Sequence, residues 1–212
     1  MNFLEVTHWL EKFKDFDIST EDDKEIVIAP SYPYLEQVFT SIKGTELTLG
    51  AQDVSTNTKG AHTGDVGAFQ LKDFCKYCIV GHSERKESTD VVSQKIDLCV
   101  QNNITPIVCF VTPEQLKTYA VFNEVALFTW EDPNNISHGG VYNPKNIEEI
   151  ETGISQLRSL VKKDTVIIYG GSVNRDNIGE LARLQGLNGV LIGNASTDPK
   201  HFFDIIVEYC KQ

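Results

Sequence analysis

The chain has 212 residues, of which 41% are apolar and 23% charged, and its formal net charge at pH 7 is -11. This length suits one α/β barrel or one doubly wound sheet and is short for two full domains. Nucleic-acid binding needs a basic surface that neutralises phosphates, so the acidic balance argues against a nucleic-acid partner. The sequence shows no apolar run of membrane-spanning length and no signal peptide, so we expect no membrane partner.

The five cysteines are an odd number without a secretion signal, which predicts reduced thiols in a cytoplasmic compartment. Cys75 and Cys78 have the spacing of a redox or metal pair. A zinc site would need a second such pair or histidines at matching spacing, and none follows. We therefore interpret both residues as entering a buried strand and predict no metal site, with a functional thiol pair as the alternative.

Strand-like and helix-like stretches alternate along the whole chain. The chain opens into a helix at Phe3–Phe16, in which four apolar side chains can share a face: Leu4, Trp9, Leu10 and Phe13. Seven later stretches read as strands, most of them apolar on both faces: 25–30, 45–52, 77–81, 106–111, 124–130, 166–170 and 189–192. Amphipathic helices are predicted between them: 34–41, 90–102, 144–161, 174–184 and 199–212. Pro144 and Pro199 suit the first turn of a helix.

This alternation predicts βαβ units, a parallel sheet and a single domain spanning residues 1–212. The strand count is seven, whereas a closed barrel of this kind has eight. One more strand would have to precede Met1, and a sheet of seven strands would leave an exposed edge.

Polar or glycine-rich residues follow four of the predicted strands, whose carboxyl ends share one face of a parallel α/β fold. The first group is Gly81-His82-Ser83-Glu84-Arg85. A histidine at a strand end can meet backbone dipoles that hold it neutral, and a neutral imidazole can donate a hydrogen bond to a substrate carbonyl. A lone histidine is more often a capping or core residue, but the adjacent Glu84 and Arg85 favour the functional interpretation.

The second group is Trp130-Glu131-Asp132-Pro133, followed by Ser137-His138-Gly139-Gly140. A carboxylate at a strand end, next to a loop with glycine hinges, suits a general base under a closing lid. A solvated acidic turn is the alternative interpretation of Glu131.

The third and fourth groups are Tyr169-Gly170-Gly171-Ser172-Val173-Asn174 and Leu191-Ile192-Gly193-Asn194-Ala195-Ser196. Glycine lets backbone N–H groups approach an anion, and the N-terminus of a following helix favours negative charge. Either turn alone is more often a simple tight turn. Two such turns separated by one helix predict a phosphate site.

These motifs together resemble the triosephosphate isomerase family, in the same order and over nearly the whole chain. The strongest matches are Ile79–Arg85 and Ile168–Val173, with further matches at 50–64, 105–109 and 189–196. The resemblance implies a TIM (β/α)8 barrel whose N-terminal strand is missing from this chain. It also implies interconversion of dihydroxyacetone phosphate and glyceraldehyde 3-phosphate, in glycolysis and gluconeogenesis, without a cofactor.

The roles of the family's residues carry over by position. His82 matches the neutral electrophilic histidine, Glu84 the glutamate beside it, and Glu131 the base that removes a proton next to the carbonyl. The resemblance places backbone N–H contacts to the substrate phosphate at four residues: Ser137, Ser172, Gly193 and Asn194. It assigns Ser137, His138 and Gly139 to the lid, and Thr63 to a loop that reaches into the neighbouring subunit of a cytoplasmic homodimer.

The chain also departs from the family pattern. The family's first strand ends in Asn-Trp-Lys-Met-Asn with a catalytic lysine, whereas this chain begins at Met1-Asn2, so we expect strand one and that lysine to be missing through truncation or a misplaced start. We expect the chain as written to be poorly stable or poorly active. The segment between Val111 and Glu124 predicts a reduced fifth helix, and Trp130-Glu131-Asp132 replaces the family's Tyr-Glu-Pro.

These departures leave two alternatives to an active isomerase open. One is a degenerate, non-catalytic homologue that binds sugar phosphates or protein partners. The other is a phosphate-binding barrel enzyme of a different reaction class, which would have to explain the ordered matches at His82 and Glu131. Turnover of dihydroxyacetone phosphate in a coupled assay separates the first alternative from the isomerase.

Overall fold

The computed structural model describes residues 1–18, 24–135 and 143–212. Contacts gather the chain into two compact units. We call residues 25–128 the central unit, and residues 1–24 together with 129–212 the terminal unit. Among the described residues, no helix is both long enough and apolar enough to cross a membrane.

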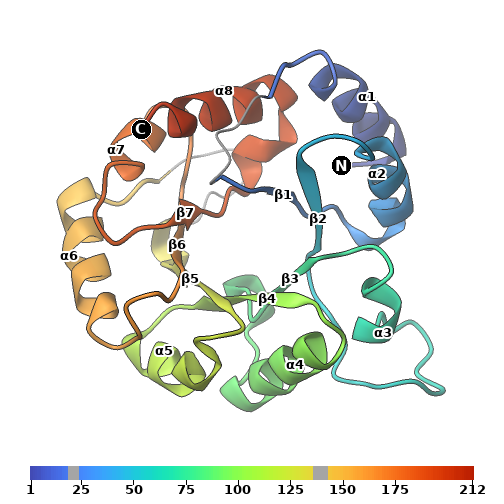
Figure 1. Cartoon of the computed structure of the whole chain (residues 1–212), viewed down its shortest axis with the longest axis horizontal. Coiled ribbons are helices and arrows are strands. Elements are labelled where there is room, and N and C mark those ends of the chain that lie inside the picture. The colour runs from blue at the N-terminus through green and yellow to red at the C-terminus, as the bar shows by residue number, and fades with distance from the viewer. Residues whose placement is uncertain (19–23, 136–142) are drawn as a thin grey trace. The chain divides into compact units, whose positions relative to one another are not determined.

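Four strands of the central unit are neighbours in the order of the chain: β1 Ile26–Ile28, β2 Leu47–Ala51, β3 Tyr77–Val80 and β4 Thr105–Phe110. All three pairings are parallel (Figure 1). Parallel neighbours need a crossover connection. Helices provide it after each strand: α2 Leu35–Ser41, α3 Ala68–Leu71, α4 Thr89–Gln101 and α5 Pro113–Tyr119.

Two crossover helices of this unit, α4 and α5, begin at side-chain caps. Ser88 accepts a hydrogen bond from the Val91 backbone N–H at the start of α4. Thr112 and Gln115 form a reciprocal capping box at the start of α5, which satisfies backbone donors that the helix leaves unpaired. The buried face of α4 then packs on β3 and β4, and α5 packs on β4.

The terminal unit alternates strands and helices in the same way. Its strands are β5 Leu127–Glu131, which starts at the end of the central unit, β6 Ile167–Gly170 and β7 Gly189–Val190. β6 and β7 are parallel neighbours, with Ile168 opposite Gly189. Its helices are α1 Phe3–Phe13, α6 Ile147–Arg158, α7 Ile178–Leu181 and α8 Pro199–Cys210.

Helix α1 packs along α8 (Figure 1). Asn2 and Glu5 form a capping box at its start. Its buried side chains are spaced as one helical face: Val6, Trp9, Leu10 and Phe13. The prediction that Leu4 shares this face is wrong. Leu4 is 75% exposed because it lies off the stripe that Val6 begins.

The seven predicted strands are confirmed, with boundaries shifted by a few residues. Pro199 is the first residue of α8, as predicted. Pro144 does not start a helix, because α6 begins at Ile147 with Asn146 as its N-cap. The helix predicted over 174–184 is reduced to α7, four residues long, since Asn174 and Asn177 hold the preceding turn through side-chain hydrogen bonds.

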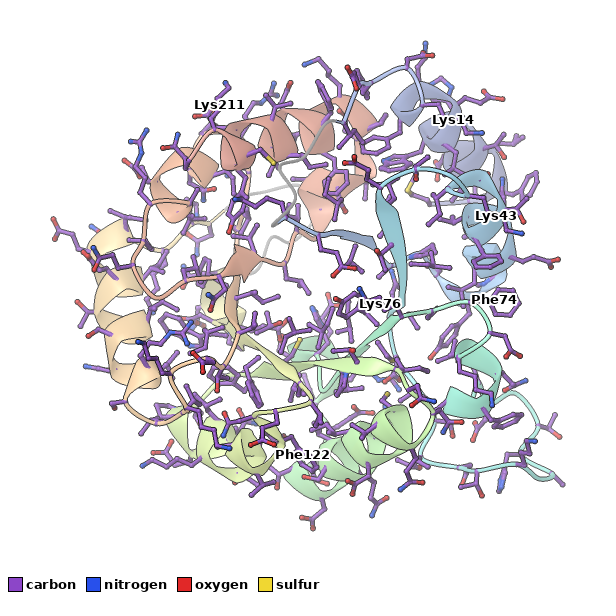
Figure 2. All side chains as sticks on the ribbon, viewed as in Figure 1. Lys14, Lys43, Phe74, Lys76, Phe122 and Lys211 are labelled. Carbon is purple, nitrogen blue, oxygen red and sulfur yellow. The ribbon has the colours of Figure 1, made fainter. Side chains whose placement is uncertain are left out.

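A small polar cluster lies where strands β1, β2 and β3 begin. The Glu25 carboxylate accepts hydrogen bonds from Lys76 Nζ at 2.7 Å, from the Tyr77 hydroxyl at 2.5 Å and from the Thr48 hydroxyl at 2.9 Å. Figure 2 labels Lys76 beside β3. One carboxylate therefore joins residues from three strands.

We expect Glu25→Gln to lower the free energy of unfolding at neutral pH by roughly 1 kcal/mol, since solvent partly screens this cluster. Burial alone raises the pKa of Glu25, but hydrogen bonds from Lys76, Tyr77 and Thr48 outweigh it and hold that pKa below its ordinary value of 4.5. A lowered carboxyl pKa stabilises the fold above that ordinary value, and this contribution is lost as the pH falls through the folded-state pKa. Urea unfolding should therefore show a difference between parent and variant at neutral pH that shrinks in acid.

The control for that experiment is Glu36→Gln, which removes an exposed carboxylate on α2. Equal losses of stability in the two variants at neutral pH would contradict the role given to the Glu25 cluster.

Candidate active site

The segment that follows β3 turns sharply at Gly81 and presents His82. Gly81 has φ +72°, a backbone conformation that residues with a Cβ rarely adopt. A Cβ on Gly81 would lie 2.9 Å from Val92 Cγ2 and 3.2 Å from the Cys109 carbonyl oxygen. His82 then serves as the N-cap of a short 3-10 helix, Ser83–Arg85.

The imidazole of His82 is held through its Nδ1 atom. Nδ1 accepts a hydrogen bond from the Glu84 backbone N–H at 3.4 Å, which requires that Nδ1 carry a lone pair. The Glu84 carboxylate lies 3.6 Å from the same nitrogen, but its side chain is 68% exposed, so water screens its pull on a proton. This backbone contact directs the Nδ1 lone pair at the Glu84 N–H, the arrangement of a tautomer that carries its proton on Nε2.

Four charged side chains hold this segment in the central unit. Lys95 Nζ on α4 lies 2.6 Å from Asp53 Oδ1 and 2.6 Å from Glu87 Oε1. Arg85 Nε lies 2.9 Å from Asp53 Oδ2. Lys95 is only 3% exposed and Asp53 8%, so these charges compensate each other out of water. Burial and the nearby Asp53 carboxylate also raise the pKa of Tyr32.

Lys95 and Asp53 were not predicted from the sequence as part of this segment. The helix pattern does indicate that Lys95 is buried, because Lys95 falls on the same face of α4 as Val92, Ile96 and Cys99, which are buried. A lysine on the apolar face of an amphipathic helix is rarely buried unless it is paired. The partner could not be identified from the sequence, since Asp53 lies 42 residues away.

Thr63 lies in the long turn between β2 and α3 and is exposed. Asp65 organises this turn, because its carboxylate accepts hydrogen bonds from Ser55 Oγ at 2.7 Å and from Asn57 Nδ2 at 2.6 Å. The pKa of Asp65 is lowered by these two hydrogen bonds, from Asn57 first and Ser55 second.

In the terminal unit, Glu131 is the last residue of β5 and is 1% exposed. Side chains alternate along a strand, so Glu131 shares a face with the fully buried Thr129, and Trp130 points to the opposite face. The Trp130 ring meets Tyr169 of β6 edge-on, with 5.8 Å between ring centroids. It also lies against Gly153 of α6, where a Cβ would overlap the ring.

Ser172, one of the predicted phosphate-binding residues, joins two segments that flank residues 136–142. Its hydroxyl donates to the Asn135 carbonyl oxygen at 2.8 Å and accepts from the Asn143 backbone N–H at 3.0 Å. Ser172 is 1% exposed. The predicted lid residues Ser137, His138 and Gly139 lie outside the described residues.

Gly193 and Asn194 lie where a short 3-10 helix, Asn194–Thr197, begins after β7. Among the described residues, and apart from its two chain neighbours, no heavy atom lies within 4 Å of the position that a Cβ on Gly193 would take. Because β6 and β7 are adjacent parallel strands, the turns that carry Ser172 and Gly193 follow the same edge of the sheet. Trp9 of α1 holds the second turn by donating from Nε1 to the Ser196 carbonyl oxygen at 2.9 Å.

The two cysteines with metal-like spacing are buried and free, Cys75 just before β3 and Cys78 within it. Burial raises the pKa of the Cys75 thiol to about 11, which makes it a poor nucleophile at neutral pH. Among the described residues, no group of three or more His, Cys, Asp and Glu side chains is placed to hold a metal ion.

Comparison with known proteins gives one consistent result. The family model described as triosephosphate isomerase matches residues 1–209. The triosephosphate isomerase of Buchnera aphidicola is 30% identical over 235 aligned positions, covering 97% of this chain and 91% of that protein. That of Aquifex aeolicus is 30% identical, covering 97% and 94%. That of Dictyostelium discoideum is 30% identical, covering 93% and 88%.

The turn before His82 can be tested with a pair of glycine substitutions. Gly81→Ala introduces both an unfavourable φ and an overlap with Val92. Gly44→Ala, at φ +81°, introduces only the unfavourable φ, because in the part of the chain that the structure describes no atom beyond its chain neighbours lies within 4 Å of the added Cβ. We expect Gly44→Ala to cost about 1 kcal/mol of unfolding free energy, and Gly81→Ala to cost about 1–3 kcal/mol more. Denaturant unfolding measures both, and equal losses would contradict the crowding at Gly81.

Proposed function

This chain belongs to the triosephosphate isomerase family, and we propose that it interconverts dihydroxyacetone phosphate and glyceraldehyde 3-phosphate. The observation that carries the proposal is the imidazole of His82, whose Nδ1 accepts the Glu84 backbone N–H in a chain that matches this family over residues 1–209. A neutral ring of that tautomer suits a hydrogen-bond donor to a carbonyl that is becoming an enediolate.

In the proposed reaction, the Glu131 carboxylate removes a proton from the carbon next to the substrate carbonyl. The electron pair of the broken C–H bond forms the C–C double bond of an enediolate, and negative charge moves to the carbonyl oxygen. His82 Nε2–H stabilises that oxygen by hydrogen bonding. Glu131 then returns the proton to the neighbouring carbon, while the hydroxyl proton of the enediolate passes to the former carbonyl oxygen, so the substrate gains or loses no proton or electron overall. Glu84 assists His82 through its backbone N–H.

We assign substrate phosphate binding to backbone N–H groups at Ser137, Ser172, Gly193 and Asn194. Apart from its chain neighbours, the described residues leave the Cβ position of Gly193 open, which supports this assignment, because an anion can approach the backbone there. Uncharged amides suit a chain with net charge -11, since they attract the phosphate locally. Ser137, His138 and Gly139 form the proposed lid, which would exclude water from the enediolate.

We further propose that the enzyme is a single-domain, cytoplasmic homodimer that works in glycolysis and gluconeogenesis and uses no cofactor. The exposure of Thr63 supports the dimer, because a partner subunit could reach this turn. The Asp65 hydrogen bonds support it further, since an ordered turn loses less conformational entropy on association than a flexible one.

Glu131→Gln tests the reaction directly. The amide keeps the size of the side chain and removes the base, so we expect kcat to fall by about 10²–10⁴-fold. Glu131→Asp should retain part of the activity, because it keeps a carboxylate at a shifted position. Coupled assays in both directions of the isomerisation measure kcat and KM.

The matched control is Glu149→Gln, an exposed glutamate in the first turn of α6, which should leave kcat unchanged. Equal kcat values for Glu131→Gln and the parent would exclude Glu131 as the base. A parent chain that binds triose phosphate but turns none over would instead support a non-catalytic homologue.

A further inference from the structure

One lysine contacts the residues on both sides of Glu131. Lys145 Nζ lies 2.9 Å from Asp132 Oδ2 and 5.3 Å from the centroid of the Trp130 ring. Trp130 and Asp132 are the immediate neighbours of Glu131 in the sequence. A single ammonium group therefore holds the chain just before and just after the proposed base.

The Trp130 side of this contact is rigid. The ring is pressed against Gly153 of α6, where any side chain would overlap it, and against Tyr169 of β6. A cation over such a ring gains an electrostatic attraction that grows as the pair leaves water. Lys145 thus links Asp132, just after β5, to Trp130 within β5, and the Trp130 ring cannot shift without disturbing α6.

The Asp132 side is an ion pair that is largely withdrawn from solvent, with both side chains 21% exposed. Asp132 Oδ1 also accepts the Asn134 backbone N–H at 3.0 Å. Burial alone raises the pKa of Asp132, but the hydrogen bonds from Lys145 and Asn134 outweigh it and lower that pKa. The carboxylate therefore stays ionised and bonded to Lys145 at neutral pH.

Interactions with the neighbouring helix α6 do not account for the position of Lys145. It precedes Asn146, the N-cap of α6, where the helix dipole favours negative charge, and Glu148 and Glu149 follow in the first turn. A cation there is unfavourable for the helix. The interactions that stabilise it come from Asp132 and Trp130 instead.

We propose that Lys145 is a positioning residue for Glu131. By fixing the backbone on both sides of Glu131, Lys145 keeps the Glu131 carboxylate aimed at the carbon that loses its proton. This inference rests on the proposed isomerase function. A reacting group displaced by about 1 Å can lose as much as 10²-fold in rate.

The test is Lys145→Met, which keeps an unbranched side chain and removes the charge. We expect kcat to fall by about 10–100-fold with KM nearly unchanged, because the variant misaligns the base without touching the phosphate site. Lys145→Arg should recover most of kcat, since a guanidinium can pair with Asp132 and stack on Trp130.

The matched control is Lys200→Met. Lys200 lies in the first turn of α8 and, like Lys145, it pairs with an aspartate, Asp204, and lies over an aromatic ring, Phe203, at 5.8 Å. The control removes the same types of interaction from α8, far in sequence from Glu131. Equal effects of Lys145→Met and Lys200→Met on kcat would overturn the proposal, as would a Lys145→Arg variant no more active than Lys145→Met.

A second measurement keeps the inference separate from the isomerase proposal. The chain has two tryptophans, Trp9 and Trp130, so fluorotryptophan labelling gives two fluorine NMR signals, which Trp9→Phe assigns. Lys145→Met should shift or broaden the Trp130 signal, and Lys200→Met should leave it unchanged. A parent without turnover would refute the isomerase function alone. A Trp130 signal unaffected by Lys145→Met would refute the positioning role.

Discussion

The segment that carries His82 depends on one buried ammonium group, that of Lys95. Lys95 lies between Asp53, which follows β2, and Glu87, which follows the 3-10 helix after His82. Arg85 bonds to the same Asp53 carboxylate. Removing one member of such a buried set leaves the other charges without compensation, which costs more than the pair contributed. The orientation of the imidazole therefore depends on charges that the substrate need not touch.

In the terminal unit, the turns that carry Ser172 and Gly193 are held in a different way, through neutral hydrogen bonds. Trp9 of α1 donates to the Ser196 carbonyl oxygen, so the first helix supports the turn that begins at Gly193. Ser172 bonds to backbone groups of Asn135 and Asn143. Backbone amides that bind an anion need this kind of support, because they stabilise the negative charge best when they are already held in place before the anion binds.

Much of the fold could be predicted from the sequence, because it depends on local patterns. Buried parallel strands are apolar on both faces, and their ends were marked by the glycine and polar residues at His82, Glu131, Ser172 and Gly193. The family's motifs coincide with those strand ends, so the candidate residues and their proposed roles could be predicted from the sequence alone.

The predictions that proved wrong concern features that tertiary contacts determine, namely where a helix begins and which of its side chains are buried. Pro144 is compatible with a first helical turn, yet Asn146 caps α6 three residues later than predicted. Leu4 is apolar but lies off the face that packs on α8. Ion pairs such as Lys95 with Asp53, or Lys145 with Asp132, join different elements of the fold. The helix pattern can mark Lys95 as buried, but no local pattern identifies the partner of either lysine.

The central claim is that His82 and Glu131 act on one substrate in one reaction. A double-mutant cycle with His82→Gln, Glu131→Gln and the combined variant tests it through kcat/KM for dihydroxyacetone phosphate. Residues that serve the same transition state are not independent, so the account predicts that the double variant loses much less activity than the product of the two single losses. Losses that multiply fully, or a single variant as active as the parent, would contradict it.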